Sequence, residues 1–411
     1  MSLSLDRLLF GLVVALALVP FNQVHLFRLG FITLGLYEVT IVSVMITATI
    51  IIALRGARRR FTGLFFSWVI VSAGFFVLTP VINGGDLRSA FRQIRPFLPF
   101  FAAVLLLVAP VKGNVTRSVE GVVVGTAIGG MAAIIIHLLF PEFLTTALSA
   151  NEDAVAISVV HGRLCWSNAV MTFVALSYVV TRKKTDVVAQ VCCMVCVFGT
   201  LLTLNRTLPP FMIAFYIVAH YSVSKRISRT FLSLAILSVM AAVLVFWLAD
   251  DRYFHLFAKR FLGHGDLANI YERCVLYGRA VMYERYLEII METFPLGQGL
   301  GLPYVSTRMG SVYITDNSFL AFFLPFGVLG GFLFIWFIER IWGALDEKNL
   351  GPMESMDLVR VLRIMLAFLC LVSLNIDVFS RNNAVLILAF LVSSILGEKS
   401  KTSTSMATVR G

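Results

Sequence analysis

Charged residues are scarce in this chain of 411 residues. Lys, Arg, Asp and Glu together make up 14 % of it, while 59 % is apolar and the mean hydropathy is +0.89. A soluble domain carries about 25 % charged residues, so this chain lacks the polar side chains that a water-exposed surface requires. The scarcity excludes a soluble globular enzyme and an intrinsically disordered chain. The composition indicates a multi-pass membrane protein.

Cysteine is also sparse, with six residues, and this excludes a disulfide scaffold. Cys193 and Cys196 form a C-x-x-C inside an apolar run, where small apolar packing is the expected role rather than metal or redox chemistry. His255 and His264 lack neighbouring carboxylates at a zinc-ligand spacing. The chain also shows no internal repeat and no removable signal peptide. We therefore expect no metal ion and no other cofactor.

Long apolar runs, in contrast, follow one another along almost the whole chain. A helix that crosses a bilayer needs roughly 20 apolar residues, so the length and composition predict an all-α polytopic membrane protein with about a dozen transmembrane helices. The expected spans are 8–22, 31–54, 61–82, 97–111, 118–140, 164–181, 186–204, 208–223, 230–249, 317–338, 361–376 and 384–397.

The basic residues predict the orientation of these spans. The net charge is +11, and clusters of Lys and Arg follow the second, fourth, sixth, eighth and twelfth runs. Basic residues collect in cytoplasmic loops, so both termini are expected in the cytoplasm and the odd-numbered exits outside. Since the basic residues are scattered over short loops, nucleic acid is not an expected partner. The clusters are Arg55 with Arg58–Arg60, Lys112 with Arg117, Arg182–Lys184, Lys225 with Arg226 and Arg229, and Lys399 with Lys401.

Four segments follow from this pattern. We expect an N-terminal membrane bundle of about nine spans over 1–249, an outside loop over 250–316, about three C-terminal spans over 317–397, and a disordered cytoplasmic tail over 398–411. Apolar residues at helical spacing predict an amphipathic helix over 277–294 that lies on the bundle. The apolar face would consist of Leu276, Ala280, Tyr283, Leu287 and Ile290, and the solvated face of Glu284, Glu288 and Glu292.

Arginines on the outer side are candidates for an anion site. Arg88, Arg92 and Arg95 are spaced i, i+4, i+7, which places them on one face of a helix. A guanidinium matches two phosphate oxygens at once, although anchoring to lipid headgroups would explain the same pattern. Arg206 ends the seventh span and is followed by Pro209 and Pro210. A charge at membrane depth faces a cavity or a partner unless it reaches the interface at the end of its span.

Further candidates lie in and after the long loop. Gly297, Gly299 and Gly301 alternate after Pro295, and alternating glycines permit a close approach of the backbone to a ligand. Asp316 and Asn317 precede the tenth span, where they would cap the helix, contribute chemistry, or do both. His161, on an outside segment, is an alternative base to Asp316.

Taken in order, these features resemble the O-antigen ligase/polymerase superfamily of bacterial inner membranes. The matching positions are Arg206, Arg279 with Tyr283, Pro295 through Gly301, Asp316 with Asn317, and Phe326 through Gly330, so the resemblance covers roughly residues 200–335. Ligases of this superfamily carry His before the Asn. This chain carries Asp316, which resembles the Wzy-type polysaccharide polymerases more closely.

The resemblance implies a GT-C-like glycosyltransferase of the bacterial inner membrane whose site faces the periplasm. Such an enzyme polymerises oligosaccharide repeat units linked to undecaprenyl pyrophosphate, by metal-independent inverting transfer, in lipopolysaccharide or other polysaccharide biosynthesis. Fixed cations would stabilise the departing pyrophosphate and a carboxylate would accept the proton of the incoming hydroxyl. The catalytic residues would be Asp316, Arg206 and Arg279, and the substrate-binding residues Arg88, Arg92, Arg95, Asn317, Gly297, Gly299, Gly301, Tyr283 and His161.

Other functions remain open from the sequence. An O-antigen ligase would transfer the glycan to lipid A core. A peptidoglycan polymerase of the shape, elongation, division and sporulation class also uses an Asp on an outside loop. A transporter or flippase of lipid-linked oligosaccharides would show related halves or discontinuous spans. The expected partners are lipid-linked oligosaccharides as donor and acceptor, membrane lipids, a chain-length regulator and a flippase.

Overall fold

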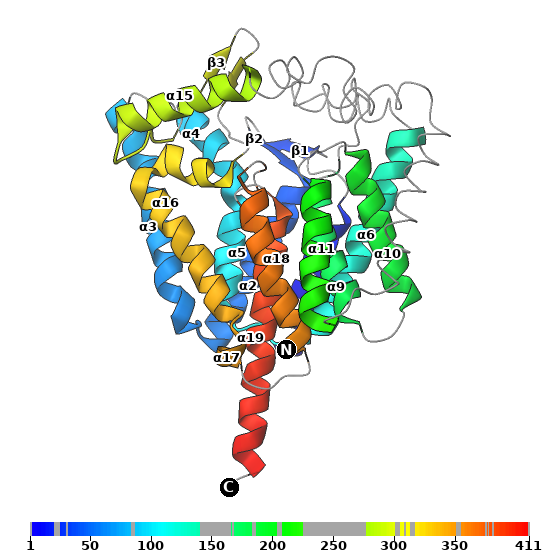
Figure 1. Ribbon diagram of the computed structural model, residues 1–411. Helices are drawn as coiled ribbons and strands as arrows, with labels where there is room; N and C mark the ends of the chain where they lie inside the picture. Colours follow the sequence, from blue (N-terminus) through cyan, green and yellow to red (C-terminus); the bar gives the residue numbers. More distant parts are fainter. Residues whose placement is uncertain are drawn as a thin grey trace.

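Most helices run side by side along one direction in the computed structural model, and they form a bundle (Figure 1). The structure describes residues 2–19, 25–29, 32–83, 87–139, 166, 168–182, 186–203, 208–224, 277–300, 305–307, 310–312, 317–350, 355–374, 376, 378–379 and 382–409.

Helices dominate the described residues, as expected for an all-α chain, and two short antiparallel hairpins accompany them. The first half contains α1 (Ser2–Leu18), β1 (His25–Leu29), β2 (Ile32–Gly35), α2 (Leu36–Arg55), α3 (Arg59–Asn83), α4 (Leu87–Ile94), the 3₁₀ helix η1 (Arg95–Phe97), α5 (Leu98–Val108), α6 (Val115–Leu139), η2 (Ala169–Met171) and α9 (Thr172–Thr181). The second half contains α10 (Val187–Leu202), α11 (Leu208–Ser224), α15 (Tyr277–Thr293), β3 (Val305–Thr307), β4 (Gly310–Val312), α16 (Ser318–Ala344), α17 (Glu347–Leu350), α18 (Met356–Val372) and α19 (Asn383–Val409).

Several helices have the dimensions of membrane spans. Among the described residues, five helices are long and apolar enough to cross a membrane, and four further apolar helices are shorter. Every expected span except 230–249 overlaps a helix, and the run 31–54 begins with the strand β2 before α2. The run 230–249 lies outside the described residues. The five long segments are Leu36–Arg55, Arg59–Val77, Ser89–Val108, Val115–Leu139 and Ser318–Ala344.

α19 is the central helix of the bundle. Its residues from Ala384 to Ile395 are buried on every side, which is the pattern of a helix surrounded by other helices. α19 packs against α1, α5, α6 and α16, and Figure 1 shows it leaving the bundle at its far end. α19 continues as a helix to Val409, within the segment 398–411 for which a disordered tail is expected. Extending an existing helix avoids the cost of nucleation, so Ser and Thr residues of modest propensity can be added to it.

A stripe of glycines on α6 lets α1 pack closely against it. Gly121, Gly125 and Gly129 recur at every fourth position, and a Cβ at Gly129 would lie 2.5 Å from the Leu18 carbonyl oxygen. A Cβ at Gly125 would lie 3.0 Å from the Val14 carbonyl oxygen. This spacing is the small-residue motif that allows helices in membranes to approach one another. The glycine spacing can be read from the sequence, but a prediction based on apolar runs alone does not consider it.

The two ends of the bundle differ, and we name them by what they contain. At the terminal end, α1 begins and α19 leaves the bundle; the loop end carries α4, α15 and the two hairpins (Figure 1). Asp6 of α1 pairs with Arg55 at 2.7 Å and accepts from the Lys112 N–H at 3.0 Å, and Arg182 lies 3.6 Å from Glu120. The described basic clusters therefore share the terminal end, as expected from the alternation of the spans.

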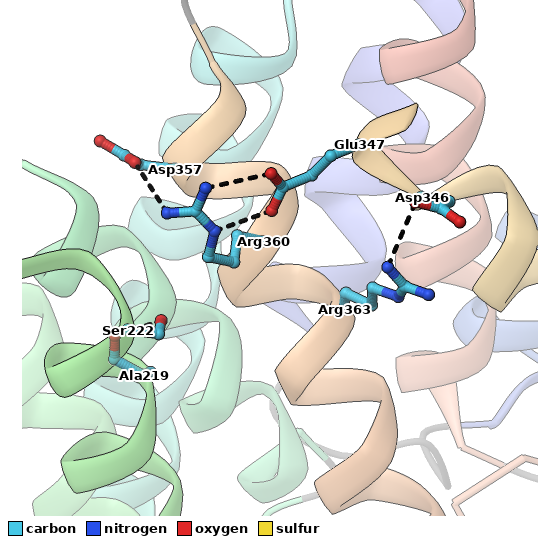
Figure 2. Close-up of polar contacts among 7 residues, drawn as sticks. All are labelled: Ala219, Ser222, Asp346, Glu347, Asp357, Arg360 and Arg363. Carbon is cyan, nitrogen blue, oxygen red and sulfur yellow. Dashed lines mark hydrogen bonds and ion pairs between the residues drawn. The ribbon is translucent and has the colours of Figure 1, made fainter. Parts of the chain in front are cut away.

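Ion pairs also fix the connection from α16 to α18 at the terminal end. Figure 2 shows the Arg360 guanidinium between Glu347 and Asp357, opposite the last turns of α11. Arg360 donates to both Glu347 carboxylate oxygens at 2.7 and 3.0 Å, and Arg363 donates to Asp346 at 3.4 Å. The hydrogen bond from Arg360 lowers the pKa of Glu347 below its ordinary value. These pairs hold α17 against α18.

Candidate functional site

The first half of α16 is the framework around which the predicted site segments gather at the loop end. Phe97, two residues after Arg95, packs edge-on against Phe322 and Phe326, with ring centroids 5.3 and 5.8 Å apart. Leu324, on the same half-helix, is buried against Tyr286 and Ile289 of α15. The arginine segment, the loop helix and the helix that follows Asp316 are thus brought together, although they are far apart in the sequence.

α16 is broken where the glycine segment meets it. Pro325 supplies no N–H, and Gly327 has a φ of 60° and a ψ of −151°, which is outside the helical region. Figure 1 shows the two halves of α16 running in different directions, the first across the loop end and the second along the bundle. The break therefore divides α16 into a first half that lies across the loop end and a second half that runs along the bundle.

The glycines of the loop approach this break, and they do so through the backbone. The N–H groups of Gln298 and Gly299 donate to the carbonyl oxygens of Leu324 and Pro325 at 2.8 and 3.1 Å. A Cβ on Gly297, whose φ is 80°, would lie 2.4 Å from the Gly327 nitrogen. The sequence predicts a close approach of this backbone to a ligand; in the structure Gly297 and Gly299 approach the backbone of α16. This packing explains the glycines without a ligand.

Asn317 is the N-cap of α16. Its side-chain oxygen accepts from the N–H groups of Phe319 and Leu320 at 2.9 and 3.2 Å, and its amide nitrogen donates to the Leu374 carbonyl at 3.0 Å. The side chain thus joins the start of α16 to the end of α18. The sequence left the capping role open between Asp316 and Asn317, and the structure assigns it to Asn317.

The next residue extends this junction. The Ser318 N–H donates to the Ser373 carbonyl at 3.0 Å, and the Ser318 hydroxyl accepts from the N–H groups of Val378 and Phe379 at 2.9 and 3.1 Å. The segment after α18 therefore forms one wall of the loop end next to the start of α16. Sequence reasoning missed this wall because the short connection between the last two spans carries no motif.

Two buried asparagines form a second junction that sequence reasoning missed. Asn168 donates to the carbonyl oxygens of Leu16, Ala17 and Val19 at 3.0 to 3.1 Å, and Asn383 donates to the Asn168 side-chain oxygen at 3.0 Å. These carbonyls end α1 and have no partners within the helix, so the amides satisfy them where water is excluded. An isolated amide at the edge of an apolar run was the available signal.

Of the three outer arginines, the structure describes the side chain of Arg95 only. Arg88 and Arg92 lie on α4, as the i, i+4 spacing predicts, and Arg95 opens η1. The Arg95 guanidinium pairs with Glu38 on the first turn of α2, and Glu38 also accepts from the Gly35 N–H at 2.8 Å. Arg95 therefore has a protein carboxylate as its partner, while the side chains of Arg88 and Arg92 lie outside the described residues.

The expected loop helix is present as α15, but its buried face differs from the expected one. Tyr286 and Ile289 are buried, whereas Leu287, expected on the apolar face, is 60 % exposed. Glu288 and Glu292 are exposed, as expected. Ile290 of the expected face is partly buried against the same contact, so the helix is rotated relative to the expected face and Leu287 is left outside the contact. Arg279 and Tyr283 lie on the backbone of α15, and their side chains are outside the described residues.

Four predicted site residues lie wholly outside the described residues: Asp316, Arg206, Gly301 and His161. Of these, Asp316 directly precedes the Asn317 cap in the sequence. Among the described residues, no group of three His, Cys, Asp or Glu side chains lies close enough to hold a metal ion.

Comparison with known proteins gives no relative from which a function could be taken. No protein-family model matches the chain, and no curated protein matches it. The function is therefore inferred from the residues and from the way the fold arranges them.

Proposed function

We propose that the chain is a polysaccharide polymerase of the bacterial inner membrane. It would join oligosaccharide repeat units, carried on undecaprenyl pyrophosphate, by metal-independent inverting glycosyl transfer. In this proposal the chain has about twelve spans, the terminal end with both termini lies in the cytoplasm, and the loop end faces the periplasm. The excess of basic residues at the terminal end supports this orientation.

One observation carries the proposal. The arginine segment, the glycine segment and the helix that begins after Asp316 meet around the first half of α16, at the end opposite the basic clusters. Glycosyl transfer from a lipid pyrophosphate needs cations and a proton acceptor on the same side of the membrane. The sequence supplies both residue types in these segments, and the fold brings the segments together.

The proposed reaction assigns a role to each catalytic residue. The acceptor hydroxyl attacks the anomeric carbon, its proton passes to the Asp316 carboxylate, and the bond to pyrophosphate breaks with its electron pair on the phosphate oxygen. Arg206 and Arg279 stabilise the charge on this leaving group, a contribution of about 3–4 kcal/mol for each preorganised contact. Arg88 and Arg92 would bind the lipid pyrophosphate of a second substrate.

The lipopolysaccharide pattern of a deletion strain tests the proposal. Loss of a polymerase leaves one repeat unit on the core, whereas loss of a ligase leaves none and lipid-linked polymer accumulates. We expect the single-unit pattern, and we expect Asp316→Ala, Arg206→Ala and Arg279→Ala to reproduce it at normal protein levels. Arg285→Ala is the matched control, because Arg285 lies on the same helix, is exposed and pairs with Glu288.

Three results would contradict parts of this assignment. Full activity of Asp316→Ala would transfer the role of base to His161. Full activity of Arg206→Lys would show that two-pronged phosphate binding is not what this residue supplies. A purified enzyme that is inert until magnesium or manganese is added would remove the role given to the arginines.

The break in α16 favours flipping of lipid-linked oligosaccharides as a second candidate. Discontinuous spans are typical of transporters, where the freed backbone groups line the substrate site. Here, however, the Leu324 and Pro325 carbonyls at the break accept from Gln298 and Gly299. A flippase deletion would trap single repeat units on the cytoplasmic leaflet, which distinguishes it from both the polymerase and the ligase.

A further inference from the structure

The second half of α15 and the turn after it expose an unusual set of large apolar side chains. Leu287, Met291, Phe294 and Leu296 are 60 %, 80 %, 66 % and 72 % exposed. Leu287 and Met291 lie one turn apart on α15, and Phe294 and Leu296 lie in the turn that directly follows the helix, so we treat the four as one edge. Contiguous exposed apolar surface of this kind marks contact with a membrane or with another protein.

The side chains of this half-helix divide into three sectors. At about 100° per residue, Tyr286 and Ile289 point to α16, whereas Leu287 and Met291 lie about 100–160° around the helix from these two residues. The charged flank between these two sectors carries Arg285, Glu288 and Glu292, all exposed, and Arg285 is paired with Glu288 at 2.8 Å. A helix with separate protein, apolar and charged sectors has the pattern of one that lies in a membrane interface.

The apolar edge continues onto the flank of the bundle. The Val328 N–H donates to the Pro295 carbonyl at 2.9 Å, which places the turn containing Phe294 and Leu296 directly beside the second half of α16. There Val328, Leu329, Phe332 and Ile335 are 41 % to 61 % exposed. These residues belong to α16, which is long and apolar enough to cross a membrane, and exposed apolar side chains on a membrane span are expected to face lipid. Figure 1 shows α15 lying across the loop end, roughly perpendicular to the helices of the bundle.

We infer that α15 lies in the leaflet at the loop end, with the edge of Leu287, Met291, Phe294 and Leu296 inserted among the lipids. The occupant of this edge is the bilayer itself, because the edge is continuous with the lipid-facing side of α16. The charged flank faces water, and insertion reaches the boundary between headgroups and acyl chains, about 5–10 Å deep. The site around the first half of α16 therefore opens at the membrane surface, where a lipid-borne substrate arrives by lateral diffusion. This placement does not depend on the reaction that the site performs.

Tryptophan scanning in lipid nanodiscs tests the placement. Met291→Trp and Phe294→Trp place the probe on the apolar edge, and Glu288→Trp and Glu292→Trp are matched controls on the charged flank of the same helix. The emission of the added tryptophan is obtained by subtracting the spectrum of the parent chain. Lipids brominated near the headgroups quench from the membrane, and iodide quenches from water.

We expect bromolipids to quench the probes at 291 and 294 and iodide to quench those at 288 and 292. Quenching of the edge probes by iodide, as strong as at 288, would overturn the inference because the helix would then lie in water. Protection of the edge probes from both quenchers would overturn it as well, since a second copy or another protein would then cover the edge. Because positions 291 and 294 are tested independently, misfolding of one variant leaves the other decisive.

Discussion

The terminal end and the loop end are held together by different interactions. Most ion pairs among the described residues lie at the terminal end, where Asp6 joins Arg55 and Glu347 joins Arg360. The loop end is instead joined by backbone hydrogen bonds at the α16 break and by the amide caps of Asn317 and Asn168. One end uses charge to tie its loops to one another. At the other end, uncharged groups shape the framework, and Arg95 with Glu38 is the ion pair that joins two segments there.

The difference has a physical basis. Basic residues at the terminal end are expected to set the orientation, and Arg55 and Arg182 among them have neighbouring carboxylates. Arg58 lacks a carboxylate partner in the described residues and donates to the Ser393 hydroxyl and carbonyl at 2.7 and 2.9 Å. Burial lowers the pKa of its guanidinium to about 10, so it remains charged at neutral pH. Charged groups therefore stabilise the terminal end, whereas uncharged groups stabilise the loop end. The variants below test this difference.

The largest effect is expected from Gly327→Ala at the loop end. A Cβ there would lie 2.1 Å from the Pro295 carbonyl oxygen at a φ of 60°, so both the space and the backbone angle forbid it. We expect a loss of at least about 3 kcal/mol, which would be seen as a collapse in the yield of monodisperse protein. Gly74→Ala is the control, since nothing lies within 4 Å of its Cβ. A normal yield of the Gly327 variant would show that the glycine segment does not dock on the break.

At the terminal end, Asp6→Ala is expected to cost about 3 kcal/mol. The variant leaves the Arg55 guanidinium, whose side chain is 11 % exposed, without its carboxylate. Thermal unfolding of Asp6→Ala, Arg55→Ala and the double variant gives the coupling energy. The double variant should be less destabilised than the sum of the single ones. Additivity of the two costs would mean that charge does not hold this end together.

Asn317→Ala is expected to cost roughly 1–2 kcal/mol, because the cap on α16 and the bond to Leu374 are both lost. Asn317→Asp keeps the acceptor for the cap and loses only the donor, so its thermal unfolding should lie closer to that of the parent. Transfer activity sharpens the comparison. A stable but inactive Asn317→Asp would indicate that the amide also contacts substrate, whereas an active one would confine Asn317 to the framework.

The smallest effect is expected from Glu347→Gln, at most about 1 kcal/mol, because the pair with Arg360 is partly exposed. Since the folded-state pKa of Glu347 is lowered, its contribution is present above the unfolded-state pKa of about 4.3 and disappears as the pH falls through the folded-state value. Melting temperatures of the parent and the variant should therefore differ at neutral pH and converge in acid. A constant difference across this range would exclude the ion pair as its cause.

Much of the site framework could be predicted from local patterns. The apolar periodicity after residue 276 predicted α15, and the segment of Arg88 and Arg92 forms the helix α4 that would place them on one face. The rotation of α15 could not be predicted, since Leu287 and Ile289 are both apolar and only the contact with Leu324 selects one face. The contact of Gly297 with Gly327 could not be predicted either. A glycine allows another group to come close, but the sequence does not show which group that is.

The sequence by itself determined that the chain is a bundle of apolar helices and that its described basic clusters lie at one end. These properties depend on composition and on the order of charges along the chain. Each segment partitions between water and lipid according to its own residues, whatever distant residues are present. Tertiary structure decided that the arginine segment, the glycine segment and the start of α16 meet, and which face α15 buries. Those outcomes depend on contacts such as Phe97 with Phe322 and Pro295 with Val328, which form only when residues from separate helices pack together.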